Sequence, residues 1–125
     1  RGQRAFAAIE VLNEPRWDIP TPALHDCYRR AYAAIRRHVA PGEVTVVFHD
    51  GFRPATEYAG YFDPATFTDV AYDVHRYQCF ERADLDLDIG GHLAKAGVEW
   101  AAEADRIQHM LGVPALAGEW SLGLD

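Results

Sequence analysis

The chain has 125 residues, of which 49% are hydrophobic and 25% charged, and this length and composition suit one domain with a single core. The formal net charge of −7 disfavours a nucleic-acid-binding surface, because neutralising phosphates requires clustered lysine and arginine. No apolar run reaches the roughly 20 residues that span a bilayer, and no signal-peptide pattern is present. We therefore expect neither nucleic acid nor a membrane as partner.

The first half of the chain alternates strand and helix patterns. Ala5 to Asn13 is a short apolar run, typical of a strand that is buried on both faces. A helix is predicted to begin at Thr21, as N-cap, with Pro22 in the first helical position. Apolar residues then recur every three or four positions until Pro41, which with the following glycine ends the pattern. The β-branched segment Val44 to Phe48 predicts a second strand.

The second half continues this alternation. A short helix near Pro54 to Tyr58 precedes a third predicted strand, Val70 to Tyr77. Asp88 to Leu111 predicts a long helix despite three glycines, and Ala115 to Trp120 predicts a fourth strand. Alternating strands and helices indicate parallel βα units, so the sequence predicts an α/β fold with one domain over residues 1–125.

Unusual polar residues stand at the C-terminal end of every predicted strand. In parallel α/β folds these ends meet at one edge, where the βα loops leave a crevice. The residues are Asn13 and Glu14 on the first strand, His49 and Asp50 on the second, His75 and Tyr77 on the third, and Glu119 on the fourth. Their common placement predicts a functional site at this edge.

Plainer interpretations exist for single members of this set. Glu14 could be an exposed loop acid, although Pro15 favours an extended backbone that would hold the carboxylate at the strand tip. The period of two places Asp73, His75 and Tyr77 on one face, where they could form a site or serve as buried supporting groups. Asp73 lies deeper, which favours a role in orienting a neighbour.

The remaining polar positions are less specific. Glu119 has Gly118 before it and Trp120 after it; a strand-end acid beside an aromatic is common in sugar sites, but it also occurs in ordinary packing. His49 and Asp50 are expected to support the site or to fix the loop that follows. Four histidines at no ligand spacing are predicted to be surface or helix-face residues, and two cysteines to be packing thiols: His25, His38, His92, His109, Cys27 and Cys79.

Two glutamates at the ends of parallel strands suggest glycoside chemistry, with one acid to protonate the leaving oxygen and one carboxylate to attack the anomeric carbon. Phosphoryl transfer is disfavoured because no GxxxxGK loop is present. A serine hydrolase is disfavoured because Ser121, the one serine of the chain, lacks the glycine-flanked nucleophile turn. No cofactor or metal is expected.

Four segments stand in order along the chain: IEVLNEP (Ile9 to Pro15), HDGF (His49 to Phe52), DVHRYQCF (Asp73 to Phe80) and AGEWS (Ala117 to Ser121). Together they resemble glycoside hydrolase family 5, and most closely its exo-1,3-β-glucanase branch. The resemblance implies a (β/α)8 TIM barrel that hydrolyses β-glucosidic bonds with retained configuration. It covers strands four to seven, so this chain would form about half of the barrel.

The resemblance also implies roles for individual residues. Glu14 corresponds to the acid/base and Glu119 to the nucleophile. The expected substrate-binding residues are Asn13, His75, Tyr77, Phe80, Phe52 and Trp120. Trp120 is included because it follows Glu119 directly.

Several alternatives stay open at the level of the sequence. Arg76 and Cys79 stand where the exo-glucanases carry His and Val, which leaves the linkage open between 1,3-β-glucanase, β-1,4-glucanase, β-mannanase and β-glucosidase activity. A non-catalytic sugar-binding half-barrel is a further alternative. The expected partners are a β-glucan or related β-linked oligosaccharide and the missing strands, supplied by the rest of a longer chain that is either secreted or cytoplasmic.

Overall fold

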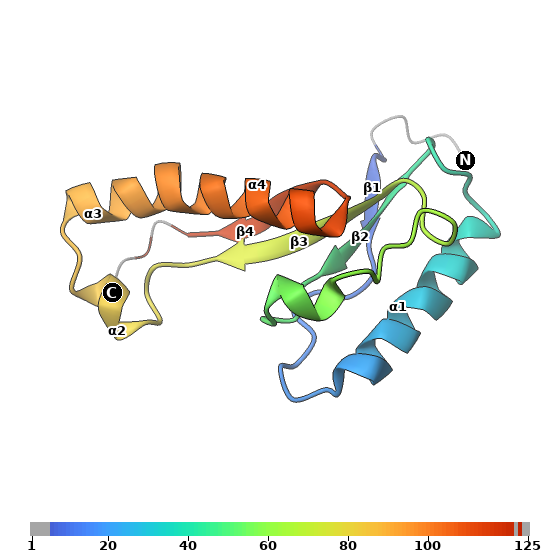
Figure 1. Cartoon of the computed structure of the whole chain (residues 1–125), viewed down its shortest axis with the longest axis horizontal. Coiled ribbons are helices and arrows are strands. Elements are labelled where there is room, and N and C mark those ends of the chain that lie inside the picture. Colours follow the sequence, from blue (N-terminus) through green and yellow to red (C-terminus); the bar gives the residue numbers. More distant parts are fainter. Residues whose placement is uncertain (1–5, 122, 124–125) are drawn as a thin grey trace.

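The computed structural model describes residues 6–121 and 123, in which four parallel strands alternate with helices (Figure 1). The strands lie in sequential order, each hydrogen-bonded to the next: β1 (Ala8–Glu10), β2 (Thr45–His49), β3 (Val70–Arg76) and β4 (Ala115–Trp120). This order, with a crossover between successive strands, is that of half a (β/α)8 barrel. The predicted α/β fold is therefore confirmed.

The crossovers differ in length and in helix content. Helix α1 (Thr21–Arg36) joins β1 to β2, and the short 3₁₀ helix η1 (Ala55–Tyr58) lies between β2 and β3. The last crossover holds α2 (Arg82–Leu85), α3 (Ile89–Ala94), a π-helical turn η2 (Lys95–Glu99) and α4 (Trp100–Leu111). In Figure 1, α4 runs beside β3 and β4, whereas α1 lies on the side of β1 and β2.

Three local predictions need correction. The first strand is shorter than the apolar run, and Ala5 lies outside the described residues. Pro20, not Thr21, is the N-cap of α1, so Thr21 is the first helical residue. The predicted helix from Asp88 is interrupted by the π turn around the exposed Gly97, although Asp88 does cap its start, accepting a hydrogen bond from the Gly91 N–H at 2.8 Å.

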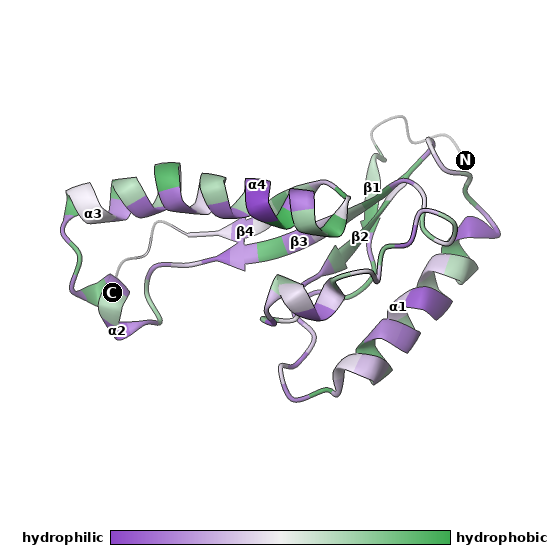
Figure 2. Cartoon of the chain, in the orientation of Figure 1, coloured by the Kyte–Doolittle hydropathy of each residue, from purple (hydrophilic) through white to green (hydrophobic). Residues whose placement is uncertain are grey.

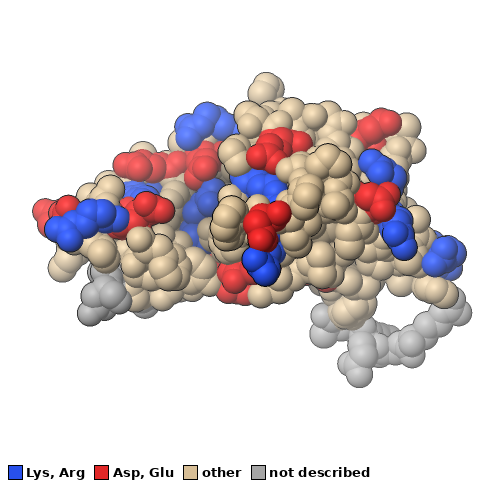
Figure 3. Space-filling view, turned by 90° about the horizontal axis from the view of Figure 1, so that it is seen from below, with Lys and Arg blue, Asp and Glu red and all other residues tan. Residues whose placement is uncertain are grey.

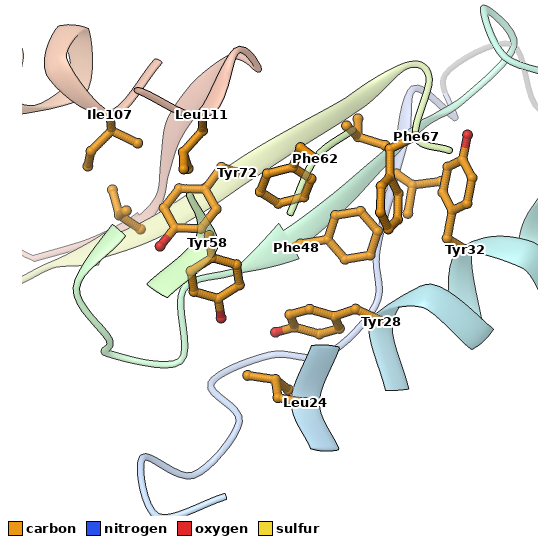
Figure 4. Close-up of a cluster of buried hydrophobic side chains, with 13 residues drawn as sticks. Leu24, Tyr28, Tyr32, Phe48, Tyr58, Phe62, Phe67, Tyr72, Ile107 and Leu111 are labelled. Atoms are coloured by element: carbon orange, nitrogen blue, oxygen red, sulfur yellow. The ribbon is translucent and has the colours of Figure 1, made fainter. Parts of the chain in front are cut away.

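The hydrophobic core lies between the sheet and the helices that cover its outer face. Figure 4 shows how aromatic side chains from α1, β2, η1 and β3 fill this layer. The rings of Tyr28 and Phe48 are 5.0 Å apart in a tilted arrangement, and those of Phe48 and Phe67 are 5.8 Å apart edge to face. Figure 2 shows the corresponding division, with hydrophobic colour on β1 and β2 and hydrophilic colour along much of α1.

Two buried tyrosines connect this core to the C-terminal end of β2. The hydroxyl of Tyr28 donates to the carbonyl of His49 at 2.8 Å, and that of Tyr58 donates to the carbonyl of Asp50 at 2.9 Å. These carbonyls belong to the strand end and so lack full ladder pairing, and the tyrosine hydroxyls supply the hydrogen bonds that buried carbonyls need. These hydrogen bonds therefore fix the position of the last residues of β2 relative to the core.

The opposite face of the sheet is polar. Because side chains alternate along a strand, Phe48 and Tyr72 face the core, whereas His49, Asp73 and His75 face the interior of the half-barrel. All three of these polar residues are buried. The predicted site residues of β2 and β3 are consequently gathered on the concave side, near the C-terminal strand ends.

Arg53 holds two of the loops that follow strands. Its buried guanidinium donates to four backbone carbonyls, those of Gly51, Arg16, Trp17 and Ile19. Three of these carbonyls lie in the loop between β1 and α1, so one side chain joins that loop to the loop after β2.

We predict that Arg53→Met lowers the free energy of unfolding by about 2–4 kcal/mol, because one buried and three partly buried carbonyls lose a charged donor. Chemical unfolding of the intact protein measures this change. Arg37→Met, which removes an exposed arginine of the same size, should change the free energy by less than about 0.5 kcal/mol. Equal effects of the two substitutions would contradict the role given to Arg53.

Candidate active site

Four of the predicted side chains, one of which is the imidazole of His75, meet at the strand ends. Nδ1 of His75 lies 2.7 Å from Oε1 of Glu14 and 3.7 Å from Oε2 of Glu119. The hydroxyl of Tyr77 donates a 2.6 Å hydrogen bond to the same Oε2 of Glu119. Residues from β3, from β4 and from the loops after β1 and β3 therefore form one continuous polar group.

The backbone of Glu14 departs from the prediction. Pro15 favours an extended conformation at the preceding residue, yet Glu14 has a φ of +44°, in the left-handed region. Such a conformation is costly for a residue with a side chain and is found mainly where surrounding contacts hold it in place. Here the buried Pro15 and the hydrogen bond to His75 supply such contacts.

Between β3 and β4, a shift of register that leaves Gly118 of β4 unpaired places His75 opposite Glu119. The pairing with β4 is irregular between Val74 and His75, so that Val74 pairs with Ala117 and His75 with Glu119. A bulge of this kind re-aims side chains at a strand end. Without it, the position opposite His75 would be Gly118, which has no side chain.

Gly118 serves the residue beneath His75. Its backbone N–H donates to Oδ1 of Asp73 at 2.6 Å, and a Cβ at position 118 would overlap the carboxylate of Asp73. Asp73 lies, in turn, 3.5 Å from Nε2 of His75. The predicted role of Asp73 in orienting a neighbour agrees with this placement.

His49 packs against His75 and fixes the loop after β2. The two rings meet edge to face with centroids 4.2 Å apart. Nδ1 of His49 accepts the N–H of Gly51 at 2.8 Å, and Oδ1 of Asp50 accepts the N–H of Phe52 at 2.7 Å. These bonds hold Gly51 and Phe52 at positive φ, and so bring the ring of Phe52 to the rim, where it is 53% exposed.

The electrostatic environments of the two histidines are opposite. Burial, with the neighbouring charge of His75, lowers the pKa of His49 to about 4, so its ring is neutral at ordinary pH. For His75, burial acts to lower the pKa, but the hydrogen bond to Glu14 and the charges of Glu119 and Asp73 outweigh it and raise the pKa. The hydrogen bond to Glu119 raises the pKa of Tyr77 to about 12, which keeps its hydroxyl a donor.

An open cavity of about 460 Å³ lies in front of these groups. The side chain of Phe80 is 77% exposed and meets the ring of Tyr77 edge to face at 5.6 Å. Exposed aromatic faces beside carboxylates suit the apolar faces and hydroxyl groups of a sugar. The residues that line the cavity are Glu14, Phe52, His75, Tyr77, Phe80, Glu81 and Glu119.

Two predicted site residues do not line this cavity. Asn13 is exposed beside Glu14, and Trp120 is 65% exposed at the end of β4. Conversely, Glu81 lines the cavity and Glu10 lies close to Asp73 and His75, and the prediction included neither. Glu10 could have been noticed as an acid inside the apolar run that became β1.

Two groups of side chains could hold a metal ion by distance alone. Glu14, His49 and His75 form one group, and Glu10, Asp73 and His75 form the other, each with ligand atoms within 4.8 Å of one another. Nδ1 of His75 already binds Glu14, and Nδ1 of His49 already binds a backbone N–H. A metal in the first group would compete with these hydrogen bonds.

The predictions for residues outside the site hold only in part. His92 lies on α3 but is buried, with Nδ1 2.7 Å from Oε1 of Gln78, so of the two predicted places, surface or helix face, the surface is wrong. Cys27 is exposed and does not pack in the core. On the face seen in Figure 3, acidic and basic side chains alternate without a continuous basic patch. Among the described helices, none combines the length and apolarity needed to cross a membrane.

Comparisons with known proteins point to one group of enzymes. No protein-family model matches the chain. Over 116 residues it is 32% identical to the probable glucan 1,3-beta-glucosidase A of Aspergillus fumigatus, covering 91% of this chain and 26% of that protein. It is 31% identical over 113 residues to glucan 1,3-beta-glucosidase 2 of Schizosaccharomyces pombe, covering 90% and 19%.

A third relative, glucan 1,3-beta-glucosidase 2 of Wickerhamomyces anomalus, is 28% identical over 117 residues, covering 93% of this chain and 26% of that protein. The chain thus spans about a quarter or less of the length of these relatives. The predicted resemblance to exo-1,3-glucanases is confirmed by these names.

We predict that His49 makes the protein less stable toward acid. Its pKa falls from 6.5 to about 4 on folding, so between these values the unfolded chain takes up a proton that the folded chain does not. The contribution of His49 to stability should therefore decrease as the pH falls from 6.5 to 4. His49→Asn, which keeps an acceptor for the Gly51 N–H, should reduce this slope in unfolding measurements; identical slopes would contradict the prediction.

Proposed function

We propose that this chain is part of the catalytic (β/α)8 barrel of a retaining β-glucosidic hydrolase of glycoside hydrolase family 5, most similar to exo-1,3-β-glucanases. The observation that carries the proposal is the convergence of Glu14 and Glu119 on Nδ1 of His75. Residues 1–125 would form one partial catalytic domain, and the rest of the polypeptide would supply the other strands.

The spacing of the two glutamates supports retention. Their nearest oxygens lie 2.7 Å and 3.7 Å from the same nitrogen, so they cannot be farther apart than these distances together. That limit, which applies to the nearest oxygens, lies at the lower edge of the separations of about 6.5–9.5 Å in inverting enzymes and accommodates the about 5–5.5 Å of a retaining pair. A carboxylate at such a distance attacks the anomeric carbon itself, forming a glycosyl-enzyme intermediate.

The hydrogen bonds support the assignment of roles. Tyr77 donates to Glu119, which stabilises the ionised carboxylate that a nucleophile requires. Glu14 is bound to an imidazole with which it can exchange a proton, as an acid/base requires. In the first step Glu14 protonates the leaving oxygen while Glu119 bonds to the sugar. In the second step Glu14 takes a proton from the water that releases the sugar.

The substrate we propose is a β-1,3-glucan or a related β-linked oligosaccharide. Phe52 and Phe80 would bind the sugar beyond the scissile bond, with Asn13 at the 2-hydroxyl and Trp120 near the cleaved sugar. Arg76, which departs from the exo-glucanases, pairs with Glu103 of α4 at 3.0 Å. This substitution is therefore directed to the helix layer and gives no reason to assign another linkage.

We predict that Glu119→Ala abolishes turnover in the full-length protein, because no nucleophile remains. Glu14→Ala should retain slow hydrolysis of aryl glucosides whose leaving group needs no protonation, and added azide should restore part of the rate. Product analysis by NMR gives the anomeric outcome. Inverted product would exclude Glu119 as the nucleophile.

A separate prediction concerns Asn13. In the full-length protein Asn13→Ala should lower kcat more than it raises KM, because contacts to the 2-hydroxyl strengthen in the transition state. Steady-state kinetics on a laminari-oligosaccharide measure both constants. A raised KM with unchanged kcat would assign Asn13 to ground-state binding only.

A further inference from the structure

The second ring nitrogen of His75 faces a buried carboxylate. Nε2 lies 3.5 Å from Oδ2 of Asp73, and it makes no hydrogen bond to any described residue. The two side chains are only 1% and 4% exposed. A buried imidazole nitrogen without a partner is costly, and catalytic hydrogen bonds are often long before substrate binds. Asp73 is therefore the acceptor within reach of an Nε2 proton.

The orientation of Asp73 is fixed from its other side. Oδ1 accepts the N–H of Gly118 at 2.6 Å, and the absence of a Cβ at Gly118 leaves room for Oδ2. One oxygen of Asp73 thus binds β4, and the other lies 3.5 Å from Nε2 of His75.

We propose that Asp73 is a positioning residue that keeps a proton on Nε2 of His75, so that Nδ1 can exchange a proton with Glu14. This inference rests on the proposed glycosidase function. In this proposal Asp73 determines which tautomer the ring adopts, because a hydrogen-bond partner at one ring nitrogen fixes whether the other nitrogen carries a proton.

The tautomer decides whether the proton between Glu14 and His75 can leave. With Nε2 protonated, the proton in the Nδ1–Oε1 hydrogen bond can pass to the glycosidic oxygen and leave a neutral imidazole and a carboxylate. The bond from that oxygen to the anomeric carbon breaks, its electron pair stays on the oxygen, and Glu119 bonds to the carbon. With the ring proton on Nδ1 instead, Oε1 of Glu14 can only accept in this hydrogen bond, and release of the shared proton would leave an imidazolate.

Glu10 supports this arrangement from β1. A carboxylate oxygen of Glu10 lies within 4.8 Å of the facing atoms of Asp73 and His75. Burial first, and then the hydrogen bond and charge of Asp73, raise the pKa of Glu10 to about 7, and Glu119 of β4 adds to the rise while His75 opposes it. Glu10 thus holds a proton in mild acid beside the carboxylate group of Asp73 that faces His75.

The test is Asp73→Asn in the full-length protein. The N–H of Gly118 binds the amide oxygen, so the new NH₂ group points to Nε2 and donates to it, which forces the Nδ1–H tautomer. We expect kcat/KM to fall roughly 100-fold on laminaribiose, whose leaving group needs a proton, and less than about tenfold on 2,4-dinitrophenyl β-glucoside. The ratio of these two values, measured on one preparation, is independent of the folded fraction.

Asp84→Asn is the matched control, since Asp84 is also a buried aspartate but binds Lys95. It should leave the substrate ratio at the wild-type value. Equal losses on both substrates in Asp73→Asn would overturn the proposal, because a structural defect would not distinguish leaving groups.

A second measurement needs no substitution. In ¹⁵N-histidine-labelled wild-type protein, a long-range ¹H–¹⁵N spectrum should show Nε2 of His75 protonated, and a ring protonated at Nδ1 alone would overturn the proposal. Wild-type protein that hydrolyses neither substrate would refute the proposed glycosidase function itself. Normal hydrolysis with an unchanged ratio in Asp73→Asn would refute only the positioning role.

Discussion

The hydrogen bond between Glu14 and His75 is the contact on which the site depends. It links the loop after β1 to the end of β3, across the intervening strand β2. The irregular pairing at Gly118 of β4 places Glu119 opposite His75, and the ring of His49 packs against the imidazole from β2. The strained backbone of Glu14 belongs to the same contact.

Strand alternation explains how a small fold carries so many buried polar groups. On the outer face Phe48 and Tyr72 join the aromatic core, which supplies most of the apolar burial. His49 and Asp73 each follow one of these residues in sequence and therefore face the inner side, where they pair with one another in the ladder. There His49 accepts the backbone N–H of Gly51, and Asp73 accepts that of Gly118. Each strand therefore stabilises the fold with one side and builds the site with the other.

The sequence predicted features that local pattern determines. The limits of β4 at Ala115 and Trp120 follow from β propensity after a glycine-proline stop, and the period of two placed Asp73 beside His75. Features set by tertiary contact escaped prediction. The left-handed Glu14 opposes the preference that Pro15 imposes, the π turn at Gly97 has no pattern of its own, and α2 is too short to show periodicity.

The polar network also shows why β1 can be only three residues long and still matter to the site. Glu10 ends the strand beneath Asp73, and the loop that follows carries Glu14 to the opposite side of His75. The chain of carboxyl and imidazole groups therefore begins and ends on the same segment and passes through β3 between them. A shift of β1 by one residue against β2 would turn Glu10 to the outer face and move Glu14 away from Nδ1. Register at this short strand is thus a requirement of the proton network as well as of the fold.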